Sequence, residues 1–117
     1  MLISVDTGPE LITGSTRMKA GTATKMIINM ISTTTMVKLG KVYGNLMVDL
    51  MAVNDKLIDR ATRIISQLAS VDEDTAQKAL IESNMSVKTA VVMLCRSVDR
   101  DNAIKMIEDN NGMLRKI

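Results

Sequence analysis

A long helical pattern in the first third of the chain is the feature that most constrains its fold. Apolar residues recur at helical spacing from about residue 17 to residue 39; Ser15 or Thr16 can cap the start, and Gly40 is the expected stop. The apolar residues of this segment cover more than one face: Met26, Ile27, Ile28, Met30, Ile31, Met36, Val37 and Leu39. Such a helix is typically buried on several sides. We therefore predict that it packs on a sheet, on a second subunit, or on both.

The composition predicts a core that is packed with methionine rather than with aromatic rings. Apolar residues make up 46% of the 117 residues, which argues against disorder, and the chain has 11 Met but only one aromatic residue, Tyr43. Without aromatic platforms, base stacking on single-stranded nucleic acid is not expected. The net charge of +2 is also too small to indicate a nucleic-acid-binding protein.

The absence of histidine and the single cysteine exclude several kinds of active site. A chain without His has no imidazole acid–base catalyst, no Ser-His or Cys-His nucleophile pair, and few ways to bind zinc. One cysteine cannot form an internal disulfide, which fits a reducing compartment. Cys95 lies at the end of the apolar run of residues 90–95, so we predict that it is buried as a small hydrophobic side chain.

The N-terminal residues have the sequence pattern of a β-strand. Residues 2–5 are apolar and are followed by the turn cluster Asp6-Thr7-Gly8-Pro9, a pattern that predicts a short strand. Because a strand needs a sheet, we expect its partner strands to lie outside this chain. The sequence has no export signal, and its longest uncharged stretch, between Lys25 and Lys38, is too short and polar to span a bilayer. We therefore predict a cytoplasmic protein with no membrane partner.

The rest of the chain predicts a series of helices. Residues 42–53 fit both a strand and a helix, and we favour the helix. A clearer amphipathic helix follows, capped by Asn54 and running to about residue 70. Three short helices then begin at Asp72, Ser86 and Asp99, each with a suitable capping residue. Their apolar stripes predict a compact three-helix bundle.

The segment of residues 8–22 is the most informative for chemistry. It is a loop rich in hydroxyl groups and glycine that opens the long helix, with two bases in the first helical turns. Free backbone N–H groups, the helix dipole and a guanidinium could converge there on a phosphate or carboxylate. Simple helix capping with solvated bases is the competing interpretation. The candidate binding residues are Glu10, Thr13, Ser15, Arg17 and Lys19.

A family resemblance covers essentially the whole chain. The run Thr-Gly-Pro-Glu-Leu-Ile-Thr-Gly-Ser-Thr-Arg-Met-Lys-Ala-Gly-Thr-Ala-Thr-Lys, residues 7–25, closely resembles the signature of N-acetylmuramic acid 6-phosphate etherases. The glucokinase regulatory proteins of animals have a looser version. Residues 40–50, Gly-Lys-Val-Tyr-Gly-Asn-Leu-Met-Val-Asp-Leu, resemble a second block of the family, followed by Asn54 and Lys56-Leu57. The tail resembles the ubiquitin-associated-like module that ends these enzymes.

The resemblance implies a fold and a division into domains. It predicts a mainly α chain, in which residues 1–70 are the C-terminal part of an α/β sugar-isomerase-type sandwich, with its last strand and long helices. Residues 71–117 would then be a small ubiquitin-associated-like three-helix bundle. Phosphosugar binding at a dimer interface is implied as well, and we expect self-association because of the apolar surface of the helix near residues 17–39.

The activity that the resemblance implies is a lyase reaction of amino sugar metabolism and peptidoglycan recycling. The D-lactyl ether of N-acetylmuramic acid 6-phosphate is cleaved by elimination and hydration, giving N-acetylglucosamine 6-phosphate and D-lactate, without metal or organic cofactor. The family's two catalytic glutamates lie earlier in the domain, so we assign no catalytic residue here and expect the chain to be inactive alone. The alternative is a non-catalytic phosphosugar-sensing or protein-interaction module related to the glucokinase regulatory protein.

Overall fold

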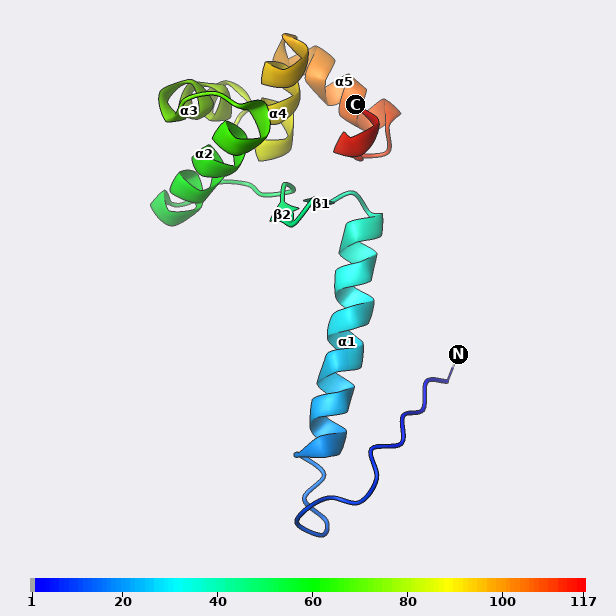
Figure 1. The fold of residues 1–117 in the computed structure, drawn as a ribbon. Coiled ribbons are helices and arrows are strands. Elements are labelled where there is room, and N and C mark those ends of the chain that lie inside the picture. Colours follow the sequence, from blue (N-terminus) through cyan, green and yellow to red (C-terminus); the bar gives the residue numbers. More distant parts are fainter. Residues whose placement is uncertain (1) are drawn as a thin grey trace. The chain divides into compact units, whose positions relative to one another are not determined.

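The computed structural model describes residues 2–117 and is mainly helical, as the sequence predicts (Figure 1). The described residues form two compact units that divide between Thr35 and Met36. In chain order the elements are α1 (Lys19–Lys38), β1 (Val42–Tyr43), β2 (Leu46–Met47), α2 (Asp55–Ala69), α3 (Glu73–Glu82), α4 (Val87–Arg96), α5 (Arg100–Asp109) and the 3-10 helix η1 (Leu114–Lys116). Among these helices, none combines the length and the apolar character needed to cross a bilayer.

The first unit consists of an irregular N-terminal segment and most of α1. Residues 2–7 have no regular secondary structure, so the strand predicted at residues 2–5 is wrong for this chain. The apolar pattern is present, but no strand in residues 2–117 pairs with it, and an unpaired strand has no ladder hydrogen bonds. The long helix is confirmed, although it begins at Lys19 because residues 11–18 fold into turns. None of its residues is buried within this chain.

In the second unit, α1 ends before the predicted stop at Gly40. Gly40 has a φ of +70°, its N–H donates to Val37 O at 3.1 Å, and the N–H of Lys41 donates to Met36 O at 3.1 Å. This pattern is typical of a glycine that ends a helix. A two-stranded hairpin follows, with Val42 opposite Met47.

Because residues 42–47 form a hairpin, the helix that we predicted for residues 42–53 is wrong. Gly44 and Asn45 form a two-residue connection, and Gly44 has a φ of +59°. Glycine takes this conformation without strain at the first central position of a tight hairpin turn, whereas a helix would not accommodate it. The chain then continues as an extended segment in which Val48 and Ala52 are buried.

Hydrogen bonds attach this extended segment to the connection between α3 and α4. Met51 forms an isolated antiparallel bridge with Ser86. The N–H of Ala52 donates to Met85 O at 3.1 Å, and the N–H of Val87 donates to Leu50 O at 3.4 Å. The segment therefore acts as an additional layer on the helices rather than as a free linker.

The predicted helix starts are confirmed for α2 to α5. The side chains of Asn54, Asp72, Ser86 and Asp99 each accept the N–H of the residue three positions later, at 2.8–3.4 Å. Such bonds satisfy backbone donors that the first helical turn leaves without partners. At Asp72 the accepted N–H and hydroxyl of Thr75 lower the pKa of the carboxyl group.

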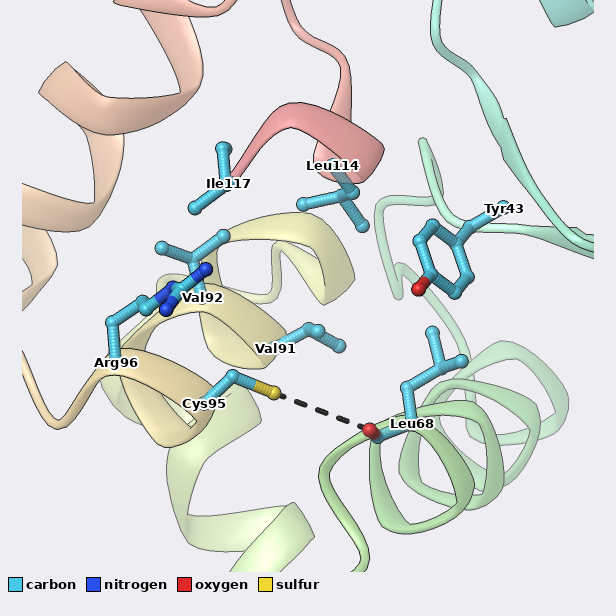
Figure 2. A pocket seen from close by; sticks show the side chains of 8 residues that line it. All are labelled: Tyr43, Leu68, Val91, Val92, Cys95, Arg96, Leu114 and Ile117. Carbon is cyan, nitrogen blue, oxygen red and sulfur yellow. Dashed lines mark hydrogen bonds between the residues drawn. The ribbon is translucent and has the colours of Figure 1, made fainter.

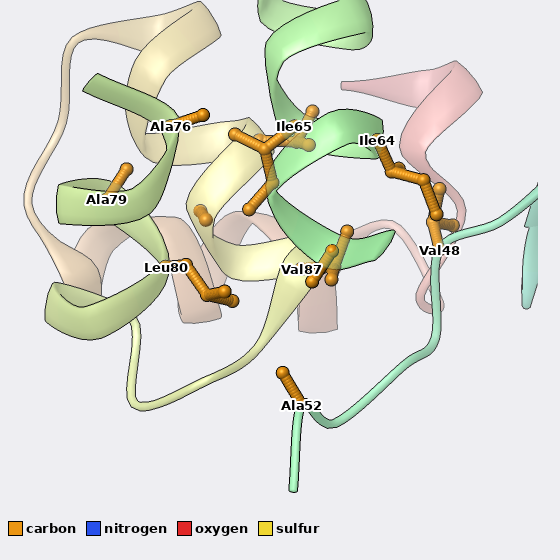
Figure 3. Close-up of a cluster of buried hydrophobic side chains, with 11 residues drawn as sticks. Val48, Ala52, Ile64, Ile65, Ala76, Ala79, Leu80 and Val87 are labelled. Atoms are coloured by element: carbon orange, nitrogen blue, oxygen red, sulfur yellow. The ribbon is translucent and has the colours of Figure 1, made fainter. Parts of the chain in front are cut away.

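The core of the second unit is shared by α2, α3 and α4 (Figure 3). Each of these helices packs against the other two, and α5 packs against α4. The buried cluster consists of Val48, Ala52, Ala61, Ile64, Ile65, Ala76, Ala79, Leu80, Val87, Ala90 and Val91. The predicted bundle of the last three helices therefore includes α2 in its core. The proposed domain boundary at residue 70 remains a prediction.

The predicted burial of Cys95 is wrong, because its side chain is exposed. The residue lies in the last turn of α4, one turn after the buried Val91 and on the same side of the helix. The buried residues of α4 end at Val92, and a continuous apolar run in the sequence does not show where along the helix burial ends.

Candidate functional site

The loop before α1 is attached to the start of the helix by Glu10. One carboxylate oxygen accepts the N–H of Lys19 at 2.9 Å, and the other accepts the N–H of Ala20 at 3.0 Å. These two bonds lower the pKa of Glu10 below its ordinary range. Glu10 therefore caps α1 from nine positions upstream. The sequence predicted Ser15 or Thr16 as the cap, and neither side chain has this role.

Lys19 strengthens the same attachment from the helix side. Its ammonium group donates to the carbonyl oxygen of Pro9 at 2.9 Å. Gly21 also allows a close approach, because a Cβ atom there would lie 3.3 Å from Thr16 O, and its N–H donates to that oxygen at 2.8 Å. The close contact at this glycine is therefore with the chain's own preceding turn.

Arg17 and Lys19 line one open hollow of the first unit. The other residues that line it are Thr7, Met18, Thr22, Ala23 and Met26. Two hydroxyl groups, a guanidinium and an ammonium thus border a partly apolar surface. Among residues 2–117, no carboxylate lies within ion-pair distance of Arg17. The ammonium group of Lys19 already donates to Pro9 O. Arg17 is therefore the cation of this hollow that is available to pair with an anion.

Thr13 and Ser15 lie in the turns that precede this hollow and do not line it. Thr13 is exposed, and Ser15 is half-buried, with its N–H donating to Ile12 O at 3.0 Å. The structure thus brings Glu10, Arg17 and Lys19 together at the start of α1, while the two predicted hydroxyl residues are set back from them. Thr7 and Thr22 were not among the predicted binding residues, although both belong to the run of residues 7–25 that carries the family resemblance.

A second group of charges joins distant parts of the second unit. Asp49 pairs with Lys41 and lies 3.4 Å from the ammonium group of Lys88, which is almost buried and donates to Gly112 O at 3.0 Å. The hydrogen bond from Lys41, followed by the field of Lys88, lowers the pKa of Asp49. Because every member has a protein partner, this group holds the fold together, and we do not consider it a ligand site.

Comparison with known proteins places the chain in a family. The C-terminal lid domain of glucokinase regulatory protein matches residues 44–98, from the hairpin turn to the end of α4. An N-acetylmuramic acid 6-phosphate etherase of Mycoplasma mycoides subsp. mycoides is 53% identical over 116 residues, which is 99% of this chain and 38% of that protein. The chain belongs to the family of these etherases.

Further relatives are similar to the same extent. Etherases of the same name from Oceanobacillus iheyensis and Mycolicibacterium smegmatis are 54% and 52% identical over 97% of this chain, and the chain covers 39% and 38% of them. The chain thus spans about two fifths of the length of these relatives, and it matches a C-terminal portion of the family. The resemblance noted from residues 7–25 and 40–50 is confirmed.

Proposed function

We propose that this chain is the C-terminal portion of an enzyme that cleaves the D-lactyl ether of N-acetylmuramic acid 6-phosphate. The products are N-acetylglucosamine 6-phosphate and D-lactate, formed by elimination and then hydration, without a metal or organic cofactor. The names of relatives that are about half identical over nearly the entire chain support this proposal. We also propose that the protein works in the cytoplasm, where a free thiol such as Cys95 stays reduced.

Within this reaction we propose that the first unit supplies part of the phosphosugar-binding wall. The observation that carries this proposal is the hollow bordered by Arg17, whose guanidinium has no acidic partner in residues 2–117. A guanidinium binds phosphate or carboxylate with two parallel hydrogen bonds. Thr7 and Thr22 add hydroxyl groups that can bond to a sugar.

The geometry changes how this site would attract an anion. The sequence suggested that free N–H groups at the start of the helix would bind it. The N–H groups of Lys19 and Ala20 donate to the Glu10 carboxylate, and the N–H group of Gly21 donates to Thr16 O. A substrate phosphate would have to displace a carboxylate to reach them, which costs the hydrogen bonds that hold the loop. We therefore expect the anion to bind at Arg17, beside the helix start.

The same bonds support the proposal that this chain is inactive alone. The elimination requires positioned acid and base groups. Residues 2–41 include two carboxylates, and both accept backbone N–H groups: Glu10 those of Lys19 and Ala20, and Asp6 that of Gly8 at 2.8 Å. Neither carboxylate lines the hollow, and the hydrogen bonds to Glu10 lower its pKa, which makes it a weaker base. We therefore expect the catalytic groups to come from elsewhere in the enzyme.

A second candidate is a non-catalytic module that senses a phosphosugar or binds a protein. It is favoured by the match of residues 44–98 to the lid domain of glucokinase regulatory protein. In this case the same hollow would bind a phosphosugar without turnover.

An amide NMR titration of the 117-residue chain with N-acetylmuramic acid 6-phosphate tests the binding proposal. We expect shifts at Arg17, Lys19 and Thr22, and a loss of affinity of about tenfold in Arg17→Gln, because a charge-assisted phosphate bond is removed. Lys25→Gln, in the same helix but outside the hollow, is the control and should bind as the parent does. No shift at millimolar ligand would overturn the proposed binding wall.

Release of D-lactate separates the two candidate functions. We expect none from this chain alone, and turnover only when the missing portion of an etherase is supplied. Turnover by the isolated chain would overturn the proposed inactivity and the non-catalytic alternative together.

A further inference from the structure

A small, partly open pocket lies within the second unit, apart from the hollow described above (Figure 2). Its volume is about 180 Å³. It is lined from β1, α2, α4 and the C-terminal segment by Tyr43, Leu68, Val91, Val92, Cys95, Arg96, Leu114 and Ile117. None of the residues that we assign to the phosphosugar site contributes to it.

The walls of this pocket are mostly aliphatic. Leu68 closes one side, Val91 and Val92 form the floor, and Leu114 and Ile117 come from the end of the chain. An engineered apolar cavity of roughly 150 Å³ stays dry and binds benzene. A pocket of about 180 Å³ therefore has room for one six-membered ring or a branched aliphatic group of similar size.

Arg96 gives the pocket a charge at its edge. Its side chain is part of the lining of the pocket, and the residue lies one helical turn after Val92 on α4 (Figure 2). No carboxylate lies within ion-pair distance of this group anywhere in residues 2–117. An unpaired guanidinium next to an apolar cavity complements a ligand with an apolar body and one negative end.

We propose that this pocket binds a small aromatic or branched aliphatic carboxylate. The apolar part of the ligand fills the space between Leu68, Val91 and Leu114, and its carboxylate pairs with Arg96. For a ligand of this size we expect a Kd on the order of 1 mM, because few atoms are buried and the ion pair is exposed to solvent.

Cys95 supplies a direct test, because it lines the pocket and is the only cysteine of the chain. Its Sγ lies 4.0 Å from Leu68 O, a long contact that leaves the thiol accessible. The rate of alkylation by neutral iodoacetamide is measured by mass spectrometry with and without benzoate at about 10 mM. At the expected affinity, benzoate should slow alkylation about tenfold, whereas benzylammonium should leave the rate unchanged.

Two variants identify the role of the charge. In Arg96→Gln, protection by benzoate should weaken about fivefold and become equal to that of uncharged benzyl alcohol. Arg100→Gln, on α5 and outside the pocket, should behave as the parent chain. Shifts of the methyl signals of Leu68, Val91 and Leu114 in the parent chain, measured by NMR, provide a readout that does not depend on any variant.

Three results would overturn the proposal. The first is a set of methyl signals and an alkylation rate that do not respond to benzoate. The second is equal protection by benzylammonium, which would remove the preference for an anion. The third is the same loss of protection in Arg100→Gln as in Arg96→Gln, which would indicate a general charge effect.

Discussion

At the scale of single residues, Gly40 and Gly44 have similar backbone conformations but different surroundings. Their φ angles are +70° and +59°. A Cβ atom on Gly40 would lie 2.6 Å from Gly112 O, whereas a Cβ atom on Gly44 would have no atom within 4 Å. Gly40 therefore combines a left-handed conformation with a backbone contact that allows no side chain, while Gly44 has only the first restriction.

We predict that Gly40→Ala destabilises the second unit by about 2–4 kcal/mol and Gly44→Ala by about 1 kcal/mol. Both substitutions introduce the strain of a left-handed alanine, and only the first forces two backbone segments apart. Urea denaturation of each variant, with the slope compared as well as the midpoint, measures the difference. Equal losses would mean that the contact between Gly40 and Gly112 relaxes at no cost.

At the scale of elements, the start of α1 depends on a carboxylate that is distant in sequence. The pKa of Glu10 is lowered in the folded chain by the N–H groups of Ala20 and Lys19. A depressed pKa means that the capping contribution is present above the unfolded value of about 4.5 and is lost as the pH falls through the folded value.

We predict that hydrogen exchange at the amides of Lys19 and Ala20 accelerates, relative to the intrinsic rate, when the pH is lowered from 6 to about 3. Glu10→Gln should show the faster exchange already at pH 6, because a neutral amide is a weaker cap. Asp6→Asn is the control, since Asp6 bonds to Gly8 in the same loop without capping the helix. Unchanged exchange in Glu10→Gln would contradict the assigned cap.

At the scale of the whole molecule, the exposed apolar side chains of α1 predict self-association. No residue of this helix is buried, and Met26, Ile28, Met30 and Ile31 are each more than half exposed. A surface of this kind usually faces a partner. Replacing Ile28 and Ile31 together by Lys should therefore convert oligomers to monomers in sedimentation experiments.

The control for this prediction is Ile81→Lys. Ile81 is 60% exposed but lies on α3, so the substitution adds the same charge without affecting α1. It should leave the association unchanged. A parent chain that sediments as a monomer at high concentration would refute the prediction.

Local signals predicted the parts of the fold that depend on near neighbours in the sequence. The caps at Asp72, Ser86 and Asp99 bond three residues ahead, and the stop at Gly40 bonds three residues back. Each of these features needs only the geometry of one helical turn. The turns before α1 were predictable in the same way, from their glycine and hydroxyl residues, whereas their role in binding remains a prediction.

The hairpin of residues 42–47 was not predictable with the same certainty. The alternation of Leu46, Val48 and Leu50 fits a strand, and the length and composition of the segment fit a helix. The choice depends on Gly44 and on the hydrogen bonds that attach the following residues to Met85 and Val87. Those bonds join positions more than thirty residues apart, which a local pattern does not contain.

The sequence by itself determined the family, the helical class, the positions of most helix ends and the loop that carries the candidate site. These features follow from residue identity and from spacings of three or four positions. Only the tertiary structure decided that Glu10 occupies the helix start, that Cys95 is exposed beside a pocket, and that α2 shares its core with α3 and α4. Each of these depends on which side chains meet after the chain has folded back, and contacts between distant positions leave no periodic trace in the sequence.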